Sequence, residues 1–303
     1  MSPFFEVSIT EYIEGNWKIF PYYDNDMNLS SMFIFEYVFD NISENEKREY
    51  MCDFTRNAIA ILEPSSILEK LQITMRLCRD IIKNLNKRNM LFLHGGMIVY
   101  RDKGICILGE KKSGKTSTIL SFLSNKADFI VNDDLSISVH NSGKLIGYGW
   151  PRAISVRKDT LDKIFTKEKG KSIERFIGLH PDNAKETYEG HTFIYVDELE
   201  KLFQCRIRRC FSVDAIIFPE FHNEEGTVIK RVNDEEKLQM FYRFVDKNTN
   251  KYFRKFETHF EGNFDDKESM EHILGHIPMY HVKQNIGNIS ETIELVGELF
   301  ENG

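Results

Sequence analysis

The stretch "GICILGEKKSGKTSTILSFL", residues 104–123, constrains the fold more than any other part of this 303-residue chain. An apolar run of strand length leads into a loop with two glycines, and residues with helical spacing follow the loop. The glycines at 109 and 114, together with Lys115 and Thr116, satisfy the pattern Gly-x-x-x-x-Gly-Lys-Ser/Thr. This order of strand, glycine loop and helix predicts an α/β layer architecture.

The loop has the residue types that hold a phosphate group. Glycine permits positive φ, so successive N–H groups can point at phosphate oxygens, and the helix that begins near Lys115 adds its free N–H groups. We expect Lys115 to reach the β and γ phosphates of ATP, and the hydroxyl of Thr116 to bind Mg²⁺. The predicted nucleotide-binding residues are Gly109, Glu110, Lys111, Lys112, Ser113, Gly114, Lys115, Thr116 and Ser117. The alternative is a surface turn that matches by chance, with odds on the order of one in a hundred.

A second apolar run, "FIVNDD" at 129–134, ends in two acids. P-loop enzymes use a strand of this kind to deliver an acid that holds Mg²⁺. Because the metal needs only one acid, we assign Asp133 to the metal and Asp134 to accept the proton of an attacking hydroxyl. The alternative role for Asp134 is to cap the turn into the next strand.

Two further side chains are candidates for catalysis. His94, in "LFLHGG", is expected beside the strand that leads into the loop, because only a short turn joins the two runs; a lone histidine is otherwise often structural. Arg152, in "GWPRAISVR", is a candidate for contacting the transferred phosphate or the acceptor. The alternative is an arginine on a strand edge that is solvated or paired with surface acids.

Hydrophobic periodicity predicts two domains, a small N-terminal α+β module at 1–65 and a P-loop domain with a C-terminal helix at 66–303. The segment from Ser65 to Asn89 has the spacing of an amphipathic helix, and so has the segment that begins at Asn288. The remaining predictions are a β meander over "LSISVH", "NSGKLIGYGWP" and "RAISVR", and strands over "HTFIYVDEL" and "SVDAIIFPEF".

Composition narrows the partners and the compartment. A formal net charge of -7 argues against a nucleic-acid partner. The five cysteines are scattered without a CxxC pair, which is typical of reduced thiols in a cytoplasmic protein. The first residues lack the features of a secretory signal, and no window has the roughly 18 apolar residues of a membrane span. We therefore expect a cytoplasmic protein with no membrane partner.

Residues 93–139, from "LHGG" through "GEKKSGKTS" to "NDDLSISV", resemble the catalytic core of HPr kinase/phosphorylase. They are also similar to the HPr-kinase-like proteins of lasso peptide biosynthesis, where a leucine precedes the histidine and Gly-x-Pro-Arg follows the acids, as "GWPR" does here. The resemblance implies a phosphoenolpyruvate-carboxykinase-like P-loop fold with a mixed sheet. It also implies transfer of the γ-phosphoryl group of ATP, with Mg²⁺, to a serine hydroxyl, and a supporting role for His94.

The chain departs from that family in two places. The HPr enzyme has an acid soon after its Asp-Asp pair, where this chain has "LSISV", and its basic substrate-binding loop has no clear copy here. We therefore expect a kinase acting on a serine or another hydroxyl of a peptide or small protein, such as a ribosomal peptide precursor, rather than on HPr. A small-molecule kinase and a nucleotide-gated binding module remain alternatives, and a homo-oligomer is left open.

Overall fold

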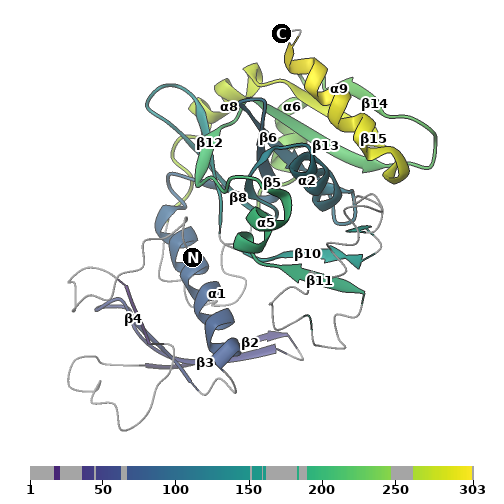
Figure 1. The fold of residues 1–303 in the computed structure, drawn as a ribbon. Helices are drawn as coiled ribbons and strands as arrows, with labels where there is room; N and C mark the ends of the chain where they lie inside the picture. The colour runs from purple at the N-terminus through teal and green to yellow at the C-terminus, as the bar shows by residue number, and fades with distance from the viewer. Residues whose placement is uncertain are drawn as a thin grey trace. The chain divides into compact units, whose positions relative to one another are not determined.

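The computed structural model describes residues 17–20, 36–43, 46–62, 67–150, 152–158, 160–161, 183, 190–246 and 262–301. The chain divides into two compact units, shown in Figure 1. One unit comprises 8–88 and 247–264, and the other comprises 1–7, 89–246 and 265–303. The domain boundary predicted after residue 65 precedes a helix that the structure groups with the N-terminal strands.

Within its described residues, the first unit contains a four-stranded sheet in the order β1-β4-β3-β2 and one long helix. Its elements are β1 (Lys18–Phe20), β2 (Glu36–Ser43), β3 (Glu46–Asp53), β4 (Ala58–Ile61) and α1 (Ile67–Asn86). Leu77 and Ile81 of α1 join a core with Tyr50 and Ile59 of the sheet. This shared core explains why the helix belongs to the N-terminal unit. The helix predicted between Ser65 and Asn89 is confirmed as α1.

The second unit is built on a nine-stranded sheet. The sheet is mixed, as the sequence resemblance implied. Its main path runs β12-β9-β8-β5-β6-β13-β15-β14, and β7 also pairs with β5. Strands β6, β13 and β15 are parallel, whereas β5, β8 and β9 form antiparallel pairs. The bounds are β5 (Leu91–Tyr100), β6 (Lys103–Leu108), β7 (Asp128–Val131), β8 (Asp134–Val139), β9 (Leu145–Tyr148), β12 (Cys210–Ser212), β13 (Ala215–Phe221), β14 (Val228–Arg231) and β15 (Met279–Gln284).

Helices α2 (Lys115–Ser124) and α9 (Ile289–Glu301) pack on one face of this sheet, where Ile119 and Ile293 share a core with Ile105 and Ile217. Side chains alternate along a strand, so Phe218 lies on the other face and packs against Phe244, just after α6 (Lys237–Tyr242). Helix α6 packs with α8 (Lys267–His276), and a short 3₁₀ turn (Ile286–Asn288) precedes α9. The C-terminal helix is therefore confirmed. No helix in the described ranges has the length and apolar character needed to cross a membrane.

Two predicted strand assignments are wrong in part. The strand "RAISVR" is not part of the meander, because β10 (Ile154–Arg157) pairs with β11 (His191–Ile194) in a separate two-stranded sheet. The outer edge of β9 is already paired with β12. In addition, only the first half of "HTFIYVDEL" is a strand. The second half begins α5 (Val196–Phe203), where the Tyr195 N–H donates to Glu198 Oε2 at 2.6 Å and caps the helix.

The cysteines are free, and they differ widely in exposure. Cys210 is exposed, whereas Cys52, Cys106 and Cys205 are buried, and burial raises the pKa of Cys205 to about 11. Because the thiolate is the reactive form, we expect one fast-reacting thiol in the native protein at pH 8. The measurement is the time course with an aromatic disulfide reagent, in which Cys210→Ser should remove the fast phase. Two or more fast thiols that persist in this variant would contradict the buried positions.

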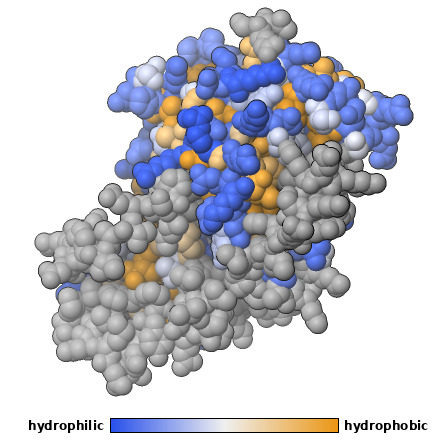
Figure 2. All heavy atoms as spheres, viewed as in Figure 1, coloured by the Kyte–Doolittle hydropathy of each residue, from blue (hydrophilic) through white to orange (hydrophobic). Residues whose placement is uncertain are grey.

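Figure 2 shows mainly hydrophilic residues on the described surface of the second unit in this view, with apolar residues between them. The charged stretch "TKEKGKSIERF" at 166–176 lies outside the described residues.

Candidate functional site

The acid pair lies at an interruption in the sheet. Strands β7 and β8 run in one direction along the same edge of β5, and residues 132–133 separate them. Asp134 pairs with both His94 and Gly95, so β5 bulges at this point. Bulges of this kind bend a strand and redirect its side chains, and they are frequent beside active sites. The bulge brings the acids to the level at which β6 ends, because Gly95 also pairs with Leu108.

The two glycines after His94 allow this close approach of main chains. A Cβ on Gly96 would lie 2.7 Å from the carbonyl oxygens of both Val131 and Asn132. A Cβ on Gly95 would lie 2.9 Å from the carbonyl oxygen of Ile107. Only glycine therefore fits between the acid turn on one side and β6 on the other. The close packing of these main chains thus explains why two glycines follow His94.

His94 lies on β5, which pairs with the strand that leads into the loop, and its ring contacts the acid pair. Its Nδ1 lies 3.3 Å from Asp133 Oδ1, and its side chain is half exposed. Its backbone N–H donates to Phe244 O at 2.9 Å, so the segment after α6 continues along the edge of β5 where β6 stops. The imidazole is therefore anchored through its backbone and free to interact with a ligand through its ring.

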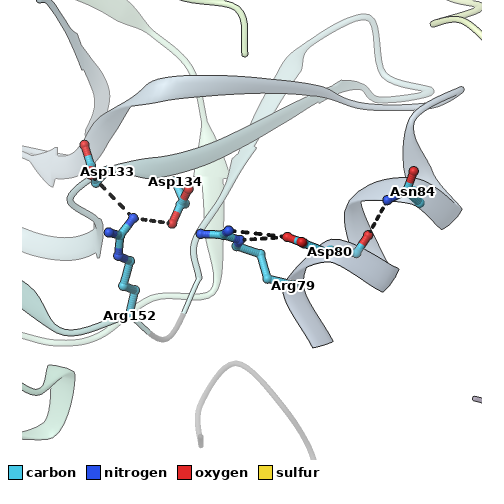
Figure 3. A network of polar contacts seen from close by, with 6 residues as sticks. All are labelled: Arg79, Asp80, Asn84, Asp133, Asp134 and Arg152. Carbon is cyan, nitrogen blue, oxygen red and sulfur yellow. Dashed lines mark hydrogen bonds and ion pairs between the residues drawn. The ribbon is translucent and has the colours of Figure 1, made fainter. Parts of the chain in front are cut away.

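Arg152 lies on both acids, as Figure 3 shows. Its Nη1 donates to Asp134 Oδ2 at 2.8 Å and approaches Asp133 Oδ2 at 3.5 Å. The guanidinium thus offsets the repulsion between two adjacent carboxylates. The alternative of an arginine paired with acids agrees with these contacts, and the predicted contact with a phosphate or an acceptor stays a prediction.

The glycine loop joins β6 to α2 as the motif requires. Gly114 has φ 104° and immediately precedes the helix, so a side chain at this position would be strained. Lys115 is buried, and its Nζ donates to the carbonyl oxygens of Gly109 at 2.7 Å and Glu110 at 2.9 Å. Burial lowers the pKa of Lys115, and the carboxylates of Asp133 and Glu110 oppose this shift. The ammonium therefore interacts electrostatically with Asp133, one of the two acids.

The other predicted loop residues differ in their surroundings. Glu110, Lys111 and Lys112 are exposed, and Glu110 pairs with Arg243 at 3.4 Å. Thr116 is partly buried in the first turn of α2, and Ser117 is buried. The Oγ of Ser113 is buried and has no hydrogen-bond partner among the described residues. Within this loop, Ser113 is thus a polar group that a ligand could satisfy.

Sequence reasoning missed two residues that support the loop, Phe221 and Gln284. They are the last residues of β13 and β15. Because these strands run parallel to β6, their C-terminal ends lie at the same end of the sheet as the loop. A Cβ on Gly114 would lie 2.9 Å from Phe221 Cε2 and from Gln284 Nε2. The apolar run "AIIF" before Phe221 signalled a strand, but the pattern does not reveal which strands are neighbours of β6.

A chain of hydrogen bonds connects β15 to the glycine loop. Gln284 Nε2 donates to Thr118 Oγ1 at 2.7 Å, and this hydroxyl donates to the carbonyl oxygen of Gly114 at 3.0 Å. Gln284 is fully buried, and its Oε1 has no partner among the described residues. Among the described residues, Thr118 is therefore the one hydrogen-bond partner of the Gln284 side-chain amide.

We expect Thr118→Val to cost about 2 kcal/mol of unfolding free energy, because it leaves the whole Gln284 amide buried without a partner. Gln284→Met should cost less than about 1 kcal/mol, since it also removes the unsatisfied Oε1. The double variant should be more stable than the sum of the two effects predicts. The measurement is urea unfolding followed by the fluorescence of Trp150 in a Trp17→Phe background. Additive effects would mean that the two side chains are not coupled.

The basic stretch "RIRR" at 206–209 contains two arginines that form ion pairs within the fold. Arg206 and Arg208 both pair with Asp128, a nearly buried carboxylate in β7, at 3.2 and 2.7 Å. Breaking a buried charge pair is costly. These two arginines therefore anchor the strand that leads to the acid pair.

No protein-family model matches the chain, and no curated protein matches it by sequence. Among solved structures, the chain is similar to the HPr(Ser) kinase/phosphatase from Coxiella burnetii, with 15% identity and a TM-score of 0.34. The match covers 70% of this chain and 99% of that chain. At this identity and TM-score, neither a family nor a function of this chain follows from the similarity.

Proposed function

We propose that this protein is an ATP-dependent kinase that transfers a phosphoryl group to a serine or another hydroxyl of a peptide or small protein. The observation that carries the proposal is the position of the acid pair. Asp133 and Asp134 lie at the level where β6 ends, and β6 leads directly into the glycine loop. The proposed phosphate-binding loop and the candidate base therefore lie at the same end of the sheet.

The loop is suited to hold the phosphates of ATP. The N–H groups at the start of α2 and the helix dipole favour an anion, and Gly114 permits a close approach of the main chain. Lys115 supplies a positive charge once its bonds to the loop carbonyl oxygens are exchanged for phosphate oxygens. The Oγ of Ser113 adds a donor that has no described partner.

The residues present also fit Mg²⁺. Asp133 and the hydroxyl of Thr116 are oxygen ligands, which Mg²⁺ prefers, and this ion commonly takes few protein ligands together with water and phosphate oxygens. When bound, the ion would neutralise charge on the phosphates.

Asp134 is the proposed proton acceptor. The acceptor hydroxyl would lose its proton to the Asp134 carboxylate as its oxygen bonds to the γ-phosphorus, and the bond to the β-phosphate oxygen would break to release ADP. His94 would orient Asp133 through its 3.3 Å contact. In the structure, Asp134 accepts a bond from Arg152, which must change before that oxygen receives a proton.

The peptide or small-protein acceptor is supported by the sequence resemblance alone. A small-molecule acceptor would need the same loop and the same base. A nucleotide-gated binding module would need the loop and one metal acid, but it would not need a second acid.

The proposal is tested by phosphate transfer from γ-labelled ATP with Mg²⁺, using serine-containing peptides, a lysate of the source cells and its small-metabolite fraction. Label on a peptide or protein, lost in Asp134→Asn, would support the kinase and identify its acceptor. Label on metabolites alone would favour the small-molecule kinase. ATP binding that depends on Lys115, with no transfer to any fraction, would contradict the kinase and favour the binding module.

A further inference from the structure

We propose that Arg152 competes with the divalent cation for the Asp133–Asp134 pair, so that cation binding displaces the guanidinium from both carboxylates. The inference rests on the proposed function for the identity of the cation. It adds a role for Arg152 as a positioning residue, because its guanidinium occupies the two carboxylates until the cation binds.

The contacts of the acids carry the first step. Asp133 Oδ1 faces His94 at 3.3 Å, and Asp133 Oδ2 faces Arg152 at 3.5 Å. The oxygen of Asp134 closest to the guanidinium is 2.8 Å from the same Nη1 atom. A cation that binds Asp133 must therefore share or replace the contact with Arg152, and the same nitrogen is the one that holds Asp134.

Charge gives the direction of the exchange. Cationic side chains already act on these carboxylates: Arg152 bonds to Asp134, and Lys115 interacts electrostatically with Asp133. A divalent cation added to this set places like charges close together, and like charges repel strongly where water is partly excluded. The anionic phosphates of a nucleotide then become the favoured partner for a released guanidinium.

Arg152 is the cation that is able to leave. Lys115 is buried and bonded to two loop carbonyl oxygens, whereas the Arg152 side chain is 48% exposed. Arg152 also follows the end of β9 and precedes β10, which belongs to a different sheet. The Arg152 guanidinium is thus the more exposed of these two cations.

The test is binding of Mn²⁺, as a probe for Mg²⁺, to the full chain without nucleotide, measured by electron paramagnetic resonance. We expect Arg152→Gln to bind Mn²⁺ about tenfold more tightly than the wild type, because the competing charge is gone. Arg152→Lys should stay near the wild type, and Asp133→Asn should lose binding. Arg209→Gln is the charge-matched control, since Arg209 is exposed in the described structure, and it should change nothing.

An unchanged or weaker Mn²⁺ affinity in Arg152→Gln would overturn the proposal. A second measurement uses the wild type and is independent of how the variant folds. The ¹⁵N signal of the Arg152 side chain, assigned by its loss in Arg152→Lys, should shift during a Mg²⁺ titration. A signal that stays in place while Mg²⁺ binds would also contradict the exchange. Neither assay includes ATP or an acceptor. A failure of the proposed cation exchange can therefore be distinguished from a failure of the proposed phosphate transfer.

Discussion

Lys115→Ala is expected to lower phosphate transfer by about 100-fold to 1000-fold, with little change in stability. The loss follows because a preorganised charge that meets the developing negative charge of a transition state has an effect of this size. The stability should change by no more than about 1 kcal/mol. Burial lowers the pKa of Lys115 despite the nearby Asp133 and Glu110, so the site penalises the ammonium on balance.

The measurement is the initial rate of transfer from γ-labelled ATP, with urea unfolding of the same preparations. Lys144→Ala is a matched control, because Lys144 is an exposed lysine in the turn between β8 and β9. It should keep the rate of the wild type. A Lys115→Ala protein that is folded and still transfers phosphate at the wild-type rate would exclude the proposed loop as the site of transfer.

Gly96→Ala is expected to destabilise the second unit by about 3 kcal/mol, since overpacking against main-chain atoms cannot be relieved by a side-chain rotation. The added Cβ would meet the carbonyl oxygens of Val131 and Asn132 at 2.7 Å, and it would also clash with Ile119 of α2. The turn that carries the acid pair must then move away from His94. Loss of transfer activity should accompany the loss of stability.

Urea unfolding followed by Trp150 fluorescence measures this effect. The chain has two tryptophans, and Trp17 belongs to the other unit, so a Trp17→Phe background isolates the signal. Gly275→Ala is the control, because a Cβ on this helical glycine meets nothing within 4 Å. It should be neutral or stabilising by up to about 1 kcal/mol. Equal stability of the two variants would contradict the close approach of β5 and the acid turn.

Local patterns in the sequence determined the parts of this protein that depend on neighbours along the chain. The strand, glycine loop and helix at 104–123 follow from hydrophobic spacing and from the conformational freedom of glycine. The acids at the end of "FIVNDD" and the two long helices follow from the same kind of signal. For this reason Lys115, Thr116, Asp133 and Asp134 could be chosen before the fold was known.

Tertiary structure decided which of these segments meet. The pairing of β7 and β8 with one edge of β5 places His94 on Asp133, and the register of distant strands brings Gln284 to the loop. Arg152 reaches the acids because the chain leaves the large sheet after β9, whose outer edge β12 occupies. Strand neighbours and register are set by packing and main-chain hydrogen bonds between residues far apart in the sequence. Periodicity within one segment carries no record of those partners.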